Sequence, residues 1–140
     1  MRAGLVVPRV KLLAGFGKAR DTRARGRVAE KAASRWLRNG GFEIVATNYR
    51  AKPGEIDIIA REGECLCFIE IKARASDTFG SALEAVPVRK QRRIARAASI
   101  FLAASEWTGP CRFDVLGIER RAGDWVFRLV RDAFWVREAR

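Results

Sequence analysis

The 140-residue sequence contains no histidine, and this absence excludes several classes of enzyme. Catalytic triads built on histidine, zinc sites with histidine ligands and imidazole general bases all need that side chain. Any catalysis or metal binding by this chain must therefore use other side chains.

Cysteine is also scarce, with three residues, an odd number, and no CxxC spacing: Cys65, Cys67 and Cys111. All three lie in apolar runs with the composition of strands. This placement is typical of reduced core residues in a cytoplasmic protein. A reactive thiol is the alternative, but no general base lies near these cysteines in the sequence.

Acidic residues are few beside basic ones, since 28 Lys and Arg against 16 Asp and Glu give a net charge of +12. A charge of this size attracts polyanions, either nucleic acid or anionic lipid. No apolar stretch approaches the length that crosses a bilayer. We therefore expect nucleic acid as partner, DNA in the first place, and no membrane association; a generic basic surface is the alternative.

The first residues form a basic segment whose apolar runs are too short and too interrupted for an export signal. We predict that residues 1–23 are a disordered basic arm, free in solution or lying along a phosphate backbone. The remaining residues 24–140 fit a single domain with one core.

Hydrophobic periodicity predicts an α/β fold with the order helix, three strands, helix, two strands. Such an order favours a central mixed sheet of about five strands with flanking helices. The helices are expected at 26–38 and 87–104, and the strands at 42–47, 55–60, 65–74, 112–118 and 125–130. The second and third strands are separated by a short Gly-containing segment, which predicts an antiparallel hairpin.

Charged residues interrupt the two strands of this predicted hairpin. Asp57 lies in the first, and Glu70 and Lys72 lie in the second. Burying such groups is costly unless they have partners. Side chains two apart on a strand point the same way, so these three groups can share one face of the sheet. The pattern indicates a site, although an ion pair between Asp57 and Lys72, with Glu55 exposed at a loop edge, is an alternative.

Phosphodiester hydrolysis needs charge neutralisation and a hydroxide-like nucleophile, which carboxylates holding Mg²⁺ (or Mn²⁺) provide. Asp57, Glu70 and the backbone carbonyl of Ile71 would form a partial shell of hard oxygen ligands. Lys72 would orient the attacking water or stabilise the developing charge. Glu30 lies on an apolar stripe of the first helix and would complete the acidic cluster, acting as a ligand through a water.

The second predicted helix begins with a basic cluster in which no acid occurs: Arg89, Lys90, Arg92, Arg93 and Arg96. Like charges at the positive end of a helix are destabilising, so a phosphate partner would relieve them. Such contacts give salt-dependent binding with little sequence preference. A solvated face is the alternative. Tyr49, Phe79 and Trp107 are candidates to stack on unpaired bases, or to pack in the core.

Eight short motifs together resemble the bacterial YraN-like family, over roughly residues 24–136. They are Gly26-x-x-Ala29-Glu30, Asn48-Tyr49-Arg50, Gly54-Glu55-Ile56-Asp57, Phe68-Ile69-Glu70-Ile71-Lys72-Ala73-Arg74, Phe79-Gly80, Lys90, Arg112-Phe113-Asp114 and Ala133-Phe134. Members of this family look like PD-(D/E)xK nucleases, similar in active-site layout to archaeal Holliday junction resolvases.

The resemblance implies a restriction-endonuclease-like core and a divalent-metal-dependent endonuclease that cuts DNA, branched or single-stranded. It assigns metal binding to Asp57 and Glu70, the catalytic lysine to Lys72, and the helical acid to Glu30. A homodimer would suit a symmetric junction. The alternative is a non-catalytic module that binds DNA or RNA. Asp114 is expected to be a structural partner of a cation or an amide.

The chain departs from the family pattern at two places. Glu-Ile-Lys replaces the usual Glu-Val-Lys, which keeps the strand chemistry. Val86 precedes Pro87 where a capping hydroxyl or acid is expected, so the second helix should start weakly or at a shifted position.

Overall fold

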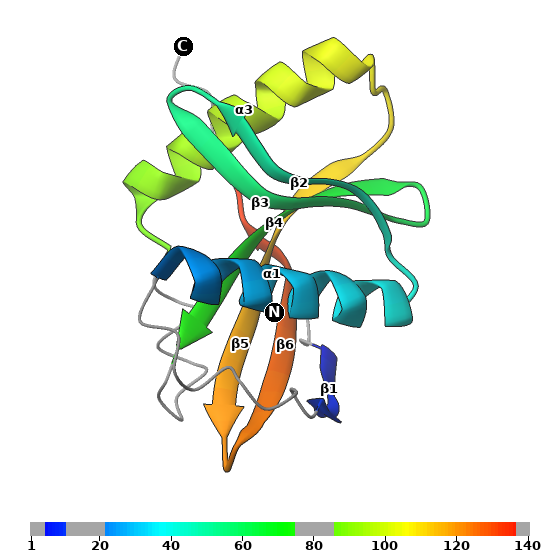
Figure 1. The fold of residues 1–140 in the computed structure, drawn as a ribbon. Coiled ribbons are helices and arrows are strands. Elements are labelled where there is room, and N and C mark those ends of the chain that lie inside the picture. Colours follow the sequence, from blue (N-terminus) through cyan, green and yellow to red (C-terminus); the bar gives the residue numbers. More distant parts are fainter. Residues whose placement is uncertain (1–4, 11–21, 75–85, 137–140) are drawn as a thin grey trace.

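The computed structural model describes residues 5–10, 22–74 and 86–136 (Figure 1). These ranges contain six strands and two helices. In chain order they are β1 (Leu5–Val10), α1 (Thr22–Asn39), β2 (Glu43–Ala51), β3 (Gly54–Glu62), β4 (Cys65–Arg74), α3 (Val88–Ser105), β5 (Cys111–Arg121) and β6 (Asp124–Phe134).

The strands form one mixed sheet in the order β1-β6-β5-β4-β3-β2. Only β4 and β5 pair in parallel among these neighbours, and α3 belongs to the crossover that parallel neighbours require. This arrangement confirms the predicted α/β class, a mixed sheet with flanking helices as in restriction-endonuclease-like cores.

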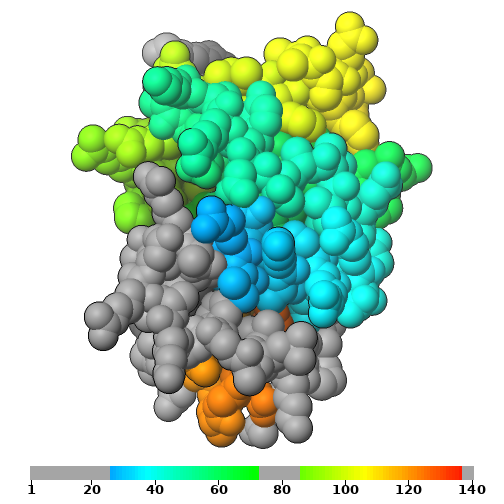
Figure 2. Space-filling model, viewed as in Figure 1, coloured from blue at the N-terminus to red at the C-terminus, as the bar shows by residue number. Residues whose placement is uncertain are grey.

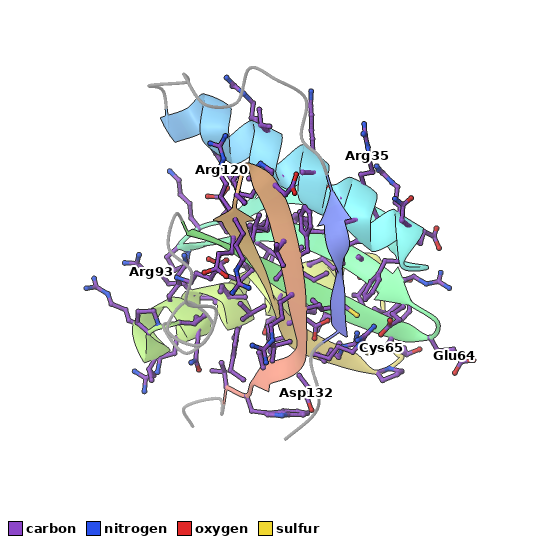
Figure 3. The ribbon with its side chains drawn as sticks, turned by 90° about the horizontal axis from the view of Figure 1, so that it is seen from below. Arg35, Glu64, Cys65, Arg93, Arg120 and Asp132 are labelled. Atoms are coloured by element: carbon purple, nitrogen blue, oxygen red, sulfur yellow. The ribbon has the colours of Figure 1, made fainter. Side chains whose placement is uncertain are left out.

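The two helices cover opposite faces of the sheet (Figure 3). On β4 the side chains of Cys67 and Ile69 join the core under α1, whereas Leu66 and Phe68 join the core under α3. This alternation follows from the two-residue period of a strand. By the same alternation Glu70 and Lys72 lie on the α3 face.

The predicted elements agree with the structure except at the two edge strands of the sheet, β2 and β1. The hairpin turn occurs at residues 63–64 as expected, but β2 continues to Ala51, beyond the predicted end at residue 47. A loop is typical of Asn, Pro and Gly, yet pairing with β3 keeps this stretch extended. The helix α3 begins after Pro87 with no side-chain cap and no acid in its first turn, in line with the expected weak start.

The strand β1 lies inside the segment for which the sequence predicts a disordered arm. It pairs antiparallel with β6, where Leu5 lies opposite Leu129. Pairing with β6 gives hydrogen-bond partners to the backbone of this run, whose β-branched residues favour a strand. This sixth strand was not predicted, and residues 22–23 of the predicted arm already belong to α1. Residues 1–4 and 11–21 lie outside the described residues, so the division into arm and domain stays a prediction.

A partly buried ionic network joins β3, β5 and β6. Asp114 is fully buried, and its Oδ1 accepts hydrogen bonds from Arg112 Nε at 2.9 Å and from the Asp132 N–H at 2.8 Å. Glu62 accepts from Arg131 at 2.6 Å and from Arg112 at 2.7 Å. The expectation that Asp114 serves a cation and an amide is therefore confirmed. The described cysteines are free, and Cys67 is buried.

Gly54, at the start of β3, lies against the backbone of α3. A Cβ atom built on it would lie 2.0 Å from the carbonyl oxygen of Arg93, whereas one built on Gly26 would meet nothing within 4 Å. Only a residue without a side chain permits this approach. Gly54 therefore sets how closely the basic helix packs beside the strand that carries Asp57.

We expect Gly54→Ala to lower the free energy of unfolding by about 1–3 kcal/mol, because a backbone carbonyl cannot move aside cheaply. Gly26→Ala is the matched control and should raise it by up to about 1 kcal/mol, since alanine favours a helix. Urea denaturation followed by circular dichroism measures both. Equal effects of the two substitutions would show that the close approach does not contribute to the free energy of unfolding.

Candidate active site

Asp57 lies at the place where β3 and β4 part, which we call the fork. Pairing between these strands runs from Glu62 and Cys65 to Ile58 and Ile69 and goes no further. One residue beyond, Oδ2 of Asp57 accepts a hydrogen bond from the Ile71 N–H at 2.8 Å. The carboxylate therefore takes the place of the next ladder bond and is held between the two strands.

Glu70 lies next to Asp57 at the fork and is 4% exposed. The pKa of Asp57 is raised to about 7, first by burial, then by the charge of Glu70 and a hydrogen bond between the two carboxyl groups. The Ile71 N–H and the more distant charge of Lys90 act in the opposite direction. The buried Glu70 and the partly buried Asp57, called the acid pair below, thus lack enough positive charge to ionise together freely.

A cation that contacts the acid pair is Lys90, from the first turn of α3. Its ammonium forms an ion pair with Oε1 of Glu70. The sequence analysis groups Lys90 with the phosphate-binding residues of this helix, but in the structure its charge is directed to a carboxylate. The sequence holds no local signal for this pair, because the partners lie on different elements.

Lys72 is half-buried and shares the α3 face of β4 with Glu70. The predicted placement of Glu70 and Lys72 on one side of the sheet is thus present. Both belong to the part of β4 that remains paired with β5, where Glu70 lies opposite Val115 and Lys72 opposite Gly117.

Glu30 reaches toward the fork from the α1 side. Its Oε2 accepts a hydrogen bond from Asn48 Nδ2 at 2.6 Å. Glu30, Asn48, Asp57 and Ile71 are among the residues that line a hollow of about 730 Å³, which we call the first hollow. Figure 2 shows the start of α1 against β2 on this face.

The predicted cluster of three acids is therefore split. Asp57 and Glu70 interact directly, while Glu30 accepts a hydrogen bond from Asn48. In the described ranges, no three side chains among Asp, Glu and Cys are placed to share one metal ion. The site is an acid pair with Glu30 on the wall of the first hollow.

Asn48 is a residue whose role in this site the sequence analysis missed. The register places it opposite Asp57, since Thr47 lies opposite Ile58 and Tyr49 opposite Ile56. Its φ of 51° is left-handed, a conformation that asparagine tolerates better than most residues. The Asn48-Tyr49-Arg50 motif was the available signal. Its backbone turns the amide toward Glu30, so it acts as a positioning residue.

The donor atoms at the fork suit a hard divalent cation. In an extended strand the N–H and C=O of one residue face the same neighbour, so the Ile71 carbonyl faces the side where its N–H meets Asp57. Two carboxylates and one carbonyl are oxygen ligands of the kind that Mg²⁺ and Mn²⁺ prefer. The residues present therefore fit such an ion.

Basic residues surround the fork. A second hollow of about 720 Å³ is lined by basic side chains of α3 and of the β2–β3 connection, among others Arg50, Lys52, Arg89, Lys90 and Arg93. Arg50 lines both hollows. Arg93 is exposed near the N-terminal end of α3 (Figure 3). Among the described residues, no ion pair involves Arg89, Arg92, Arg93 or Arg96.

The aromatic residues considered for base stacking are engaged elsewhere. Tyr49 packs edge-to-face on Phe101, with ring centroids 5.2 Å apart. Trp107 Nε1 donates a hydrogen bond to the Pro110 carbonyl at 3.1 Å. Phe79 lies outside the described residues. No helix in the described ranges combines the length and the apolar character needed to cross a bilayer.

Comparison with known proteins gives a family match over most of the chain. A family model described as "Uncharacterised protein family UPF0102" matches residues 29–118. A UPF0102 protein of Chlorobium chlorochromatii (strain CaD3) is 44% identical over 119 residues, which cover 81% of this chain and 92% of the relative. Another, of Hahella chejuensis (strain KCTC 2396), is 48% identical over 110 residues, 78% of this chain and 88% of the relative.

The raised pKa of Asp57 predicts a pH-dependent cost to stability. The unfolded side chain titrates near 3.8 and the folded one at about 7, so stability is lost as the pH rises between these values. We therefore compare the change in the free energy of unfolding that Asp57→Asn causes at two pH values. We expect this change to be more favourable at pH 8 than at pH 4.5, by on the order of 2 kcal/mol.

Urea denaturation at both pH values, in EDTA, measures this difference. Glu64→Gln, in the exposed β3–β4 turn, is the matched control and should show no such change with pH. An Asp57→Asn effect that is the same at pH 4.5 and pH 8 would contradict the raised pKa.

Proposed function

Because the chain belongs to the YraN family, UPF0102, whose description names no activity, we propose its function from the site: a divalent-metal-dependent endonuclease that hydrolyses phosphodiester bonds of DNA. The observation that carries the proposal is the acid pair at the fork, in which Glu70 is buried and Asp57 partly buried, with Lys72 on the same strand face as Glu70. A perturbed carboxyl beside a hollow is more typical of a functional site than of a structural ion pair.

The residues that would hold Mg²⁺ or Mn²⁺ are Asp57, Glu70 and Ile71, the last through its carbonyl. When bound, the ion supplies positive charge to the phosphate oxygens and lowers the pKa of a water. The chain contributes two preorganised carboxylates whose mutual repulsion favours a cation. Burial of Glu70 keeps that repulsion unscreened by solvent.

We propose that Lys72 acts at the reacting phosphate. Its Nζ would orient the attacking water and stabilise the negative charge that develops on the phosphorus oxygens. Glu30 would hold a second water in the first hollow, positioned by the Asn48 amide. These roles use atoms on both sides of the fork, where a scissile phosphate can meet them.

Phosphate binding is assigned to the arginines around the hollows. Arg50 lines both hollows, and Arg89 and Arg93 line the second. Phosphate contacts position a nucleic acid but carry no sequence information. We therefore propose substrates defined by shape, such as branched or single-stranded DNA.

Cleavage assays test the activity. We expect wild type to cut junction, flap or single-stranded DNA with Mg²⁺ or Mn²⁺, and Glu70→Ala and Lys72→Ala to lose at least about 100-fold, because each removes charge stabilisation at the reacting group. Glu64→Gln is the control, an exposed acid away from the fork. Equal cleavage by wild type and both site variants would trace the activity to a contaminant and remove the proposal.

Salt dependence tests the binding surface. Arg89→Ala/Arg93→Ala should weaken DNA binding and reduce the slope of log K against log salt by about 0.7–1.8, since each lost phosphate contact removes about 0.7–0.9. Arg35→Ala/Arg38→Ala on α1 removes the same charge from exposed positions and is the matched control. Fluorescence anisotropy with DNA and an RNA competitor measures both affinity and preference. Identical slopes for the two double variants would reject the surface.

One observation favours the alternative of a non-catalytic nucleic-acid-binding module. Glu70 is already ion-paired with Lys90, and no third acid joins the pair among the described residues. Titration calorimetry separates the two functions. Tight DNA binding without any uptake of Mg²⁺ or Mn²⁺ would support the module and exclude the metal-dependent nuclease.

A further inference from the structure

Lys90 occupies the position from which a positive charge can neutralise the acid pair. Its ammonium contacts Glu70, and its charge also lowers the pKa of Asp57. The two carboxylates lie on β3 and β4, while the ammonium comes from the first turn of α3. Lys90 is thus a counter-ion that belongs to the fold.

An ammonium and a divalent cation compete for the same carboxylate oxygen, because their charges repel at that separation. We propose that Lys90 is the resident counter-ion of the acid pair, and that a divalent cation binds there by displacing its ammonium, which then turns to a phosphate of the nucleic acid. The inference rests on the proposed function, and it makes one side chain the link between metal binding and substrate binding.

The surroundings of Lys90 allow this movement. Its side chain is 46% exposed, whereas that of Glu70 is 5% exposed, so the lysine can leave and the carboxylate cannot. Lys90 also lines the second hollow, beside Arg50, Arg89 and Arg93. A displaced ammonium would therefore enter a basic surface at the positive end of a helix, where a phosphate is the favourable partner.

The residue type fits the role. The other members of the basic cluster on α3 are arginines, and the one that reaches the acid pair is lysine. A lysine ammonium is a compact point charge on a flexible stem, and it makes no bidentate fork with a carboxylate. It can be exchanged for a metal ion more easily than an arginine.

Metal affinity tests the displacement directly. In titration calorimetry with Mn²⁺ at pH 8.5, where a proton on Asp57 competes little, we expect Lys90→Met to bind the ion about tenfold more tightly than wild type, because no ion pair has to be broken. Arg92→Met removes the same charge from an exposed position of α3 and should change the affinity less than about twofold. Equal or weaker binding by Lys90→Met would overturn the proposal.

A second measurement uses the unchanged protein and so does not depend on the folding of a variant. Acylation of lysines, quantified by mass spectrometry, should become several-fold faster at Lys90 when Mn²⁺ is added, with exposed Lys52 and Lys31 as internal references. An unchanged rate at Lys90 under saturating Mn²⁺ would overturn the displacement.

The outcomes separate this inference from the proposed function. Mn²⁺ binding that Glu70→Gln abolishes, with no effect of Lys90→Met and no change in acylation, leaves the metal site and rejects only the role of Lys90. Absence of Mn²⁺ binding in both wild type and Lys90→Met rejects both. Binding in Lys90→Met alone would overturn the displacement, since it shows that the ion cannot remove the ammonium of the unchanged protein.

Discussion

The hydrogen bond from the Ile71 N–H to Asp57 is the interaction on which the site depends. It ends the pairing of β3 and β4 and holds one carboxylate in the gap, next to the buried carboxylate of Glu70. Without this bond the gap would expose an unpaired amide, which a folded chain avoids. The same bond therefore satisfies the backbone and concentrates negative charge.

Two acids in this molecule show how partners decide the state of a carboxylate. Hydrogen bonds from Arg131 and Arg112 lower the pKa of Glu62 to about 2. Burial and the neighbouring Glu70 raise the pKa of Asp57 to about 7. The charge of Glu62 is compensated by its arginines, and their hydrogen bonds connect strands of the sheet. The carboxyl group of Asp57 lacks such compensation, a property that is common among groups that bind a ligand.

The sequence predicted features that depend on local periodicity. The two-residue period placed Glu70 and Lys72 on one face, the hairpin turn fixed the relation of β3 to β4, and the cost of burying Asp57 marked the site. It did not predict that Lys90 turns inward or that Asn48 adopts a left-handed backbone, because both depend on elements distant in the chain. Residues 48–53 looked like a loop because Asn and Pro favour turns, but the neighbouring strand extended β2 to Ala51.

The contact between Gly54 and the backbone of Arg93 has a consequence for how the molecule can vary. It fixes the helix that carries the positive charges to the strand that carries the acid, so the spacing of opposite charges is built into the main chain. Exposed side chains on α3 can then be exchanged without altering that spacing, because it is held by backbone atoms and not by side chains.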